Sequence, residues 1–219
     1  PTSLSIGLVY VIGAESFGPG HLIVATLLHL WAIRLAFYLG RRSWGQPEDK
    51  RYQAMRAARG SGFRWTSLFI VFWLQAGLAW LVSLPLLFVF YANVSIAWID
   101  VLAVTFFLVG FFFEVIGDWQ MNRFRSDPNN VGQVCDVGLW RYTRHPNYFG
   151  EALLWWGFWF FALARSAPLW SIASPLLITF LLLRVSGARL LEQSLVKEKP
   201  SYQDYIRRTP VFVPWIPTP

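Results

Sequence analysis

The chain has 219 residues, of which 55% are hydrophobic and only 14% charged, with a formal net charge of +7. Ordinary globular proteins carry about 25% charged residues, so this chain has too few to cover a water-facing surface. Its one cysteine, Cys135, excludes an internal disulfide and has no partners at the spacing of a metal site. The histidines are also scattered along the chain, so we expect no bound metal.

Long apolar segments predict membrane-spanning helices. We place them near 21–40, 66–91, 98–121, 147–164 and 168–186, after a shorter apolar segment at 4–14. About 20 apolar helical residues cross a bilayer core, because every backbone polar group must be paired internally. The sequence therefore predicts an all-α, polytopic transmembrane helix bundle of about six helices, forming a single domain over residues 1–219. Residues 4–14 are too short to span alone, which leaves room for one further helix before them.

Two features modify this pattern. An amphipathic stretch near 48–58 predicts a helix that lies in the membrane interface. Pro85 predicts either a bend in the helix at 66–91 or its outer end, because proline cannot donate the helical hydrogen bond.

The positive charge is concentrated on one side of the predicted membrane. Of the 19 basic residues, 17 lie in loops 41–65 and 118–148 or in and beside the tail from Arg184 onward, leaving Arg34 within a helix and Arg165 opposite. By the positive-inside rule these loops and the C-terminus are cytoplasmic. The charge thus reflects topology, and we expect membrane lipids rather than nucleic acid as partners. The oligomeric state is left open.

The densest polar cluster is RYTRHPNYFGE at 141–151, directly before an apolar helix. Arginines beside a helix N-terminus favour a phosphate group, because the free N–H groups and the helix dipole attract anions. The alternative is that these arginines only contact lipid headgroups. The candidate binding residues here are Tyr142, Arg144, His145, Asn147, Tyr148 and Glu151.

A second polar group lies on the helix at 98–121 and at its end. Glu114, Asp118, Asn122 and Arg125 are spaced by four, four and three residues, which places them on one helical face. An acidic residue at membrane depth usually lines a cavity. The alternative is a solvated helix end, which suits Asn122 and Arg125 better than the two acids.

The tail carries a third group. Arg184 and Glu192 are eight residues apart and would share a face of one helix, although snorkelling to the interface also explains Arg184. The tyrosine-rich tail, including Tyr205, is expected to fold back over a nucleotide bound near residues 141–148. No GxGxxG or GxxxxGK[ST] motif occurs, so a dinucleotide would bind without a Rossmann domain or a P-loop.

These residues resemble a known family. The stretch EVIGDWQMNRFRSDPNNVGQVCDVGLWRYTRHPNYFGE, within 114–159, is similar to the C-terminal domain of steroid 5α-reductases, especially their bacterial branch. The likeness runs from about residue 21 to the end, including RRSWGQPEDKRYQAMR and LLEQSLVKEKPSYQDYIRRT. It implies a bacterial inner-membrane protein that holds NADPH in a cytoplasm-facing pocket built from about residues 110–219. It also implies a lipophilic substrate that enters from the bilayer.

The resemblance implies the residues that contact NADPH. They are Asp118, Arg125, Tyr142, Asn147, Glu151, Arg184 and Glu192, whereas Arg144, His145 and Tyr148 match related sterol reductases better than the steroid 5α-reductases themselves. Asn122 and Tyr205 join these candidates from their positions in the polar groups described above. The implied reaction transfers hydride to a C=C bond, usually of an enone, in a steroid-like or other lipid. Trp31 occupies the position of the family's proton-donating tyrosine, so the catalytic candidates are Tyr38, two turns onward, and the upstream acid Glu15.

Two other classes of function compete with a reductase. Isoprenylcysteine and phospholipid methyltransferases share an RHPxYxG-like segment and would use S-adenosylmethionine, but they typically carry adjacent acidic residues where this chain has LLEQ with one glutamate. A non-catalytic lipid-binding relative would keep the pocket without turnover.

Overall fold

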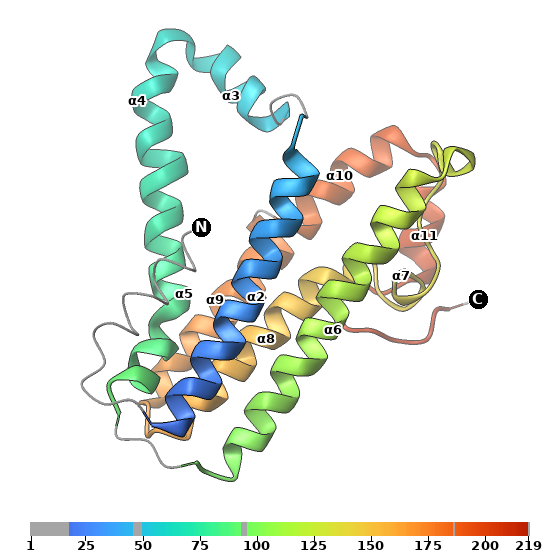
Figure 1. Ribbon diagram of the computed structural model, residues 1–219. Helices are drawn as coiled ribbons and strands as arrows, with labels where there is room; N and C mark the ends of the chain where they lie inside the picture. The colour runs from blue at the N-terminus through green and yellow to red at the C-terminus, as the bar shows by residue number, and fades with distance from the viewer. Residues whose placement is uncertain (1–17, 46–49, 93–95, 186, 219) are drawn as a thin grey trace. The chain divides into compact units, whose positions relative to one another are not determined.

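The computed structural model describes residues 18–45, 50–92, 96–185 and 187–218, which contain helices and loops but no strand. The predicted segment at 4–14 and the catalytic candidate Glu15 lie outside this range. Two compact units divide the chain at Ser95/Ile96, and Figure 1 shows their helices in chain order. The second unit contains the half, about 110–219, that the sequence predicts to bind a cofactor. The single domain over the whole chain stays a prediction.

The first unit confirms the helices predicted near 21–40, 48–58 and 66–91. Its N-terminal helix begins where the backbone N–H of Gly18 donates to Nδ1 of His21 at 3.0 Å. The His21 ring also stacks 6.0 Å from the ring of Phe90. Pro85 lies inside the last helix, which continues five residues beyond it, so it does not mark the helix end. The elements are α2 (Pro19–Ser43), α3 (Lys50–Arg59), the 3₁₀ turn η1 (Gly60–Gly62), α4 (Phe63–Ser67), the π-helical η2 (Leu68–Trp73) and α5 (Leu74–Phe90).

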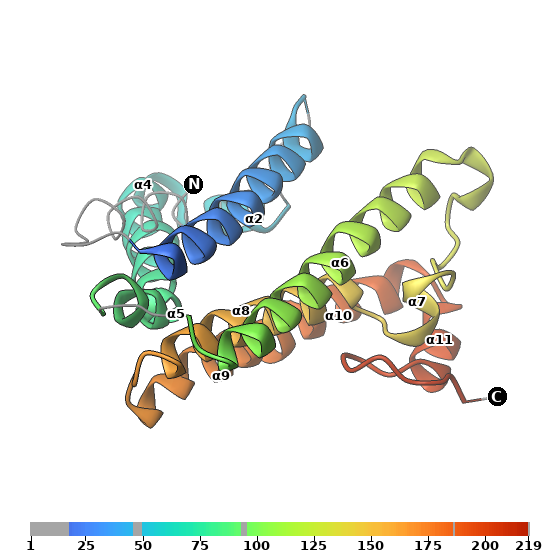
Figure 2. The same cartoon turned by 60° about the horizontal axis from the view of Figure 1, so that its bottom comes forward.

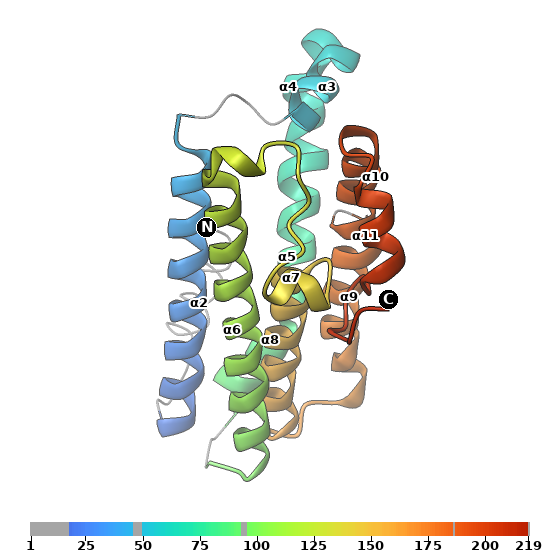
Figure 3. The ribbon, with the colours of Figure 1, turned by 90° about the vertical axis from the view of Figure 1, so that its right-hand side faces the viewer.

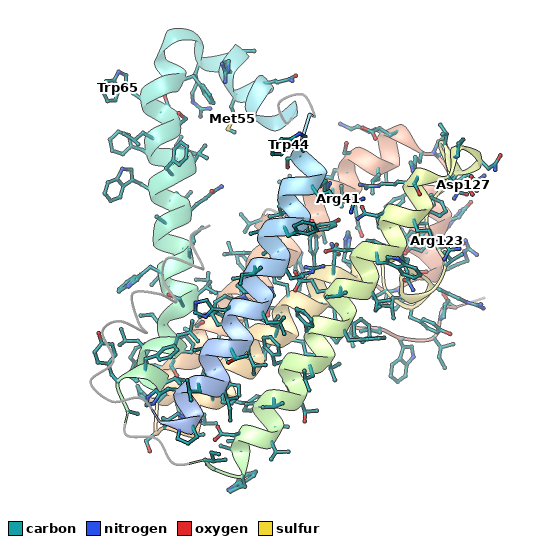
Figure 4. The ribbon with its side chains drawn as sticks, in the orientation of Figure 1. Arg41, Trp44, Met55, Trp65, Arg123 and Asp127 are labelled. Carbon is teal, nitrogen blue, oxygen red and sulfur yellow. The ribbon has the colours of Figure 1, made fainter. Side chains whose placement is uncertain are left out.

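The second unit contains two long helices and a set of shorter ones. The helix predicted at 98–121 extends further, to Ser126, because polar residues that face water continue a helix as well as apolar ones do. Figure 4 shows Arg123 and Asp127 at this extended end. The elements are α6 (Ile99–Ser126), η3 (Pro128–Asn130), α7 (Leu139–Tyr142), α8 (Pro146–Leu163), η4 (Leu169–Ile172), α9 (Ala173–Phe180), the π-helical η5 (Leu181–Val185), α10 (Ala188–Glu198) and α11 (Tyr202–Arg208).

Four largely helical stretches are long and apolar enough to cross a bilayer: Pro19–Ser43, Trp65–Phe90, Ile99–Ser126 and Leu169–Glu198, the last of which includes residue 186, outside the described part of the chain. These stretches make this a polytopic helical membrane protein. Many large side chains on these helices are exposed, among them Trp65 and Phe72. Such exposure suits a lipid environment, in which apolar side chains need no protein cover.

Helices α6 and α8 run antiparallel in close contact, which Figure 3 shows end to end. A Cβ atom on Gly150 would lie 2.4 Å from the carbonyl oxygen of Gly110, and one on Gly157 would lie 2.8 Å from that of Ala103. Glycine at these positions lets the two backbones approach, as small residues do in membrane helix pairs. At the other end of the contact, Pro146 packs against Gly117. The first turn of α8 is therefore level with Gly117, and α6 extends beyond it.

A buried ion pair joins α6 and α8 at the end far from Pro146. Nη1 of Arg165 donates to Oδ1 of Asp100, and Nη2 donates to Oδ2 at 3.2 Å. The two side chains are only 3% and 6% exposed. Asp100 also accepts the backbone N–H of Ala97 at 2.9 Å, and Arg165 donates to the carbonyl of Phe161 at 3.0 Å. The sequence placed Arg165 opposite the other arginines but did not predict its partner.

The last predicted helix is interrupted. η4, α9 and η5 cover residues 169–185 of the span predicted at 168–186, but a new helix, α10, begins only after Gly187. A Cβ atom on Gly187 would lie 2.0 Å from the carbonyl oxygen of Leu182, so the chain turns tightly there. The prediction that Arg184 and Glu192 share one helical face assumed an unbroken helix and is wrong for that reason.

Candidate functional site

The candidate site is the end of unit 2 at which α8 begins. The side-chain amide of Asn147 donates to Oδ1 of Asp118 at 3.2 Å, and its Oδ1 accepts the backbone N–H of Tyr148 at 3.1 Å. Asp118 is buried and Asn147 half-buried. The structure thus brings together two predicted residues that lie 29 positions apart, at the level where α6 changes from apolar to polar.

Arg144, two residues before α8, points into the protein. Its Nε and Nη2 donate to the two carboxylate oxygens of Glu192, at 2.7 and 3.2 Å. Its Nη1 donates to the carbonyl oxygens of Ile206 and Thr209, at 3.0 and 2.6 Å. A planar guanidinium suits such a fork-shaped set of acceptors. Most of the donors of Arg144 are therefore used within the chain, to join α8, α10 and the end of α11.

His145 completes this arrangement. Its Nε2 lies 2.9 Å from the same Oε1 of Glu192 that Arg144 contacts. The imidazole is 1% exposed, and the ring of Tyr148 stacks on it at 5.3 Å with an angle of 7° between the planes. We call Arg144, His145 and Glu192 the clamp. Tyr148 is half-buried, so the clamp supports a ring that is partly accessible.

The chain after α11 folds back onto residues 142–144, in the region where the tail was expected to cover a nucleotide (Figure 2). The backbone N–H of Arg144 donates to the carbonyl of Pro210 at 2.9 Å, and that of Trp215 donates to the carbonyl of Tyr142 at 2.9 Å. Between them the hydroxyl of Thr143, fully buried, donates to the carbonyl of Phe212 at 2.8 Å. Whether this tail also covers a nucleotide stays a prediction.

Tyr205 ties α11 to α7. Its hydroxyl donates to the carbonyl of Trp140, whose indole N–H in turn donates to the carbonyl of Gly117 at 3.0 Å. Burial raises the pKa of Tyr205 well above its ordinary value, and the nearby Tyr202 raises it further. The phenol therefore stays a hydrogen-bond donor throughout the physiological range. Tyr205 was predicted to bind a cofactor, and its hydroxyl is instead engaged within the chain.

The remaining cofactor candidates lie around this core. Asn122 and Arg125 are exposed on the extension of α6, Tyr142 is 44% exposed at the end of α7, and Glu151 is half-buried one turn into α8. Arg184 is exposed on η5. The structure thus separates the predicted residues into exposed groups, which can meet a ligand, and buried ones, which hold the chain together.

The catalytic candidates belong to the first unit. Tyr38 lies on α2, where the guanidinium carbon of Arg34 sits 5.3 Å from the centre of its ring. Trp31 is on the same helix, and Glu15 lies outside the described residues. Within the described part of the chain, no group of three or more His, Cys, Asp or Glu residues is placed to hold a metal ion.

Two residues that matter for this site were missed by the sequence reasoning. Trp140 and Thr143 each connect α7 or its end to a distant segment, α6 in one case and the tail in the other. Both lie in or directly beside the RYTRHPNYFGE cluster. The sequence signal that could have singled out Thr143 is a threonine placed between Arg141 and Arg144 in the RYTR segment.

Fold and site together define a polytopic helical membrane protein in which a buried clamp fastens the last helices to the start of α8. The chain belongs to the family described as "Protein of unknown function (DUF1295)", whose model matches residues 3–209. It is also similar to "Uncharacterized protein C594.04c" of Schizosaccharomyces pombe, with 26% identity over 244 residues, covering 98% of this chain and 69% of the relative. No solved structure matches.

Proposed function

We propose that this protein is a membrane-embedded, NADPH-dependent reductase that transfers hydride to a C=C bond, such as that of an enone, in a steroid-like or other lipid. The observation that carries the proposal is the position of the Asp118–Asn147 and His145–Tyr148 pairs. They gather at one end of an apolar helix pair, where a lipid and a water-soluble coenzyme can both arrive. The resemblance to steroid 5α-reductases over the same residues supplies the kind of reaction.

The residues at this end fit a phosphorylated dinucleotide. Arg125 and Arg184 are exposed. One guanidinium group can bind two oxygens of the same phosphate. Arg184 lies in a π-helical segment, a distortion that often occurs at functional sites. Asn147 offers a side-chain amide, and the half-buried ring of Tyr148 offers a stacking surface.

The clamp has a supporting part in this proposal. Arg144 and Glu192 use their polar atoms on one another, on His145 and on backbone carbonyls, so they act by positioning Asn147 and Tyr148 rather than by touching phosphate. Groups held rigidly by their own neighbours position a ligand better than groups on free loops.

The chemistry needs a hydride, a proton and stabilisation of negative charge on the substrate oxygen. Bound NADPH would supply the hydride. We propose Tyr38 as the proton donor, with Glu15 as the acid that assists it. Apart from Arg34 and Arg165, all basic residues fall in the predicted loops 41–65 and 118–148 or in and beside the tail, so we propose that these parts are cytoplasmic, where NADPH is available. The bacterial inner membrane stays a prediction.

Coenzyme binding is the first test. The purified full chain in nanodiscs is titrated with NADPH, NADH and S-adenosylmethionine while its thermal stability is followed. A ligand that binds only the folded state raises the melting temperature, and about 100 times its dissociation constant adds roughly 2.7 kcal/mol. We expect stabilisation by NADPH. Stabilisation by S-adenosylmethionine alone would identify a methyltransferase and overturn the proposal.

Variants locate the site. Asn147→Ala and Arg184→Ala should each weaken NADPH binding by roughly tenfold or more, the loss expected for one charge-assisted hydrogen bond. Gln193→Ala and Lys197→Ala, at exposed positions of α10, are matched controls that should bind like the wild type. Unchanged affinity in both site variants would show that the coenzyme binds elsewhere.

Turnover separates an enzyme from a binder. A lipid extract incubated with the protein and NADPH is searched by mass spectrometry for products that gain two hydrogens. Tyr38→Phe should abolish this gain without weakening NADPH binding. Binding of NADPH with no such product from any extract would favour a non-catalytic lipid-binding protein.

A further inference from the structure

The segment after α11 forms a strap, residues Thr209–Thr218, that is pinned at both ends. It begins at the hydrogen bond from Arg144 to Pro210 and passes Tyr142, which accepts the N–H of Trp215 at 2.9 Å. It returns to α11, where the N–H of Thr218 donates to the carbonyl of Arg208 at 3.0 Å. Its backbone is therefore fixed by its own protein, and its side chains are held in a defined place.

The strap presents apolar side chains outward. Val213, Trp215 and Ile216 are 60%, 72% and 74% exposed. Exposing apolar surface to water costs a free energy of about 25 cal/mol per Å². Because the strap is pinned at both ends, it cannot turn these side chains inward. These side chains would be more stable in a partly apolar environment than in water.

The depth of the strap in the membrane follows from its neighbours. The indole N–H of Trp140 reaches Gly117, and Asn147 reaches Asp118, so α7 and the first turn of α8 are level with the point where α6 changes from apolar to charged. The strap is hydrogen-bonded to residues 142–144, which lie between these two positions. It therefore lies at the boundary between the bilayer core and water.

Charge around the strap is positive. Arg141, Arg207 and Arg208 are exposed beside it. Two carboxylates face them: Asp204 pairs with Arg207, and Asp136 lies 3.8 Å from Arg208. Three guanidinium groups against two carboxylates leave a positive excess. Tryptophan, aliphatic side chains and arginine together are typical of segments that sit in an anionic lipid interface.

We propose that the strap is an interfacial anchor, in which Val213, Trp215 and Ile216 insert into the headgroup region of an anionic membrane surface. The strap is attached to Thr143 and Arg144, so the membrane itself would hold the end of the clamp in place. This inference depends on the membrane span and not on the proposed reaction.

The test places an environment-sensitive fluorophore on the strap. Ile216→Cys, in a background with Cys135→Ala, is labelled and reconstituted in nanodiscs of phosphatidylcholine containing roughly a third phosphatidylglycerol, an anionic surface that attracts basic segments. Gln203→Cys, at an exposed position of α11, is the matched control. Ile216 and Gln203, the two labelled positions, both have exposed side chains. A melting temperature equal to that of the wild type checks that each variant folds.

We expect the label at position 216 to emit at shorter wavelength than the label at 203. We also expect spin labels on the lipid headgroup region to quench it about twofold more strongly, because a segment of this kind lies only roughly 5–10 Å into the interface. Equal emission and quenching at the two positions would overturn the proposal. A label at 216 that is quenched neither by lipid spin labels nor by aqueous iodide would also overturn the proposal. Quenching of that label only by spin labels on a second copy of the protein would overturn it as well.

Discussion

Nε of Arg144 donates a 2.7 Å hydrogen bond to Oε1 of Glu192, and the same oxygen lies 2.9 Å from Nε2 of His145. The side chains of Arg144 and Glu192 are 9% and 16% exposed. One carboxylate therefore serves two basic groups of the RYTRHPNYFGE cluster from a helix that begins more than 40 residues later. The contact connects the loop before α8 and the start of α8 to the last helices of the chain.

Removing the carboxylate should destabilise the protein. Glu192→Ala leaves the guanidinium of Arg144 buried without its counter-charge, and we expect a loss of about 3 kcal/mol in the free energy of unfolding. Titration with SDS in mixed micelles measures it. The double variant Arg144→Met/Glu192→Met removes both charges and should lose less than the two single variants summed. Strict additivity would mean that the two side chains do not stabilise one another.

The ion pair between Asp100 and Arg165 should behave in the same way at the other end of α6 and α8. Asp100→Asn leaves Arg165 buried with its main partner neutralised, and the expected loss is about 3–5 kcal/mol, with partial recovery in Asp100→Asn/Arg165→Met. The same SDS titration applies. The pair is far from Asn147, so neither variant should change the affinity for NADPH. A changed affinity for NADPH would indicate that the coenzyme binds at the Asp100–Arg165 end of the helix pair and not at the Asn147 end.

The close approach of α6 and α8 should not tolerate a methyl group. Gly150→Ala would place Cβ 2.4 Å from the carbonyl oxygen of Gly110 and 2.6 Å from the backbone nitrogen of Glu114, and neither backbone atom can move alone. We expect a lower melting temperature and a loss of more than about 2 kcal/mol, as for overpacked cores. Gly77→Ala is the control, since no atom lies within 4 Å of its added Cβ. There alanine should be neutral or stabilising by up to about 1 kcal/mol.

The buried phenol of Tyr205 predicts a pH dependence of stability. Burial raises its pKa in the folded state above the value of about 10 in the unfolded chain. Its contribution is therefore complete below about pH 10 and is lost as pH rises further, because only the unfolded chain then releases the proton. Tyr205→Phe should be less stable than wild type at pH 8, by about 1 kcal/mol for the lost hydrogen bond to Trp140. Between pH 10 and about 11.5 its stability should fall less steeply. If stability falls with pH at the same slope in the wild type and in Tyr205→Phe, folding does not raise the pKa of this phenol.

The sequence alone was enough to predict most of the long helices. Apolar runs of about 20 residues predict helices whatever packs against them, because the bilayer requires internal hydrogen bonding. For this reason the helices near 21–40, 66–91 and 147–164 agree with α2, with α4 to α5, and with α8. The sequence suggested that the tail folds back over a nucleotide near residues 141–148, but not that its backbone binds residues 142–144 themselves.

The sequence could not show which polar residues face inward. Arg144 and Arg125 look alike as arginines near helix ends, yet one is buried in the clamp and the other exposed. The outcome depends on a carboxylate 48 positions away and on the carbonyls of Ile206 and Thr209, which only the packed chain brings near.

Hydrophobic pattern and charge placement therefore determined that this is a helical membrane protein with a polar end. Only the tertiary structure decided which side chains at that end support the fold and which remain accessible to a ligand. The physical reason is that a helix forms from interactions within a few residues, whereas a buried charge is stable only where distant segments supply its counter-charge and its hydrogen-bond acceptors.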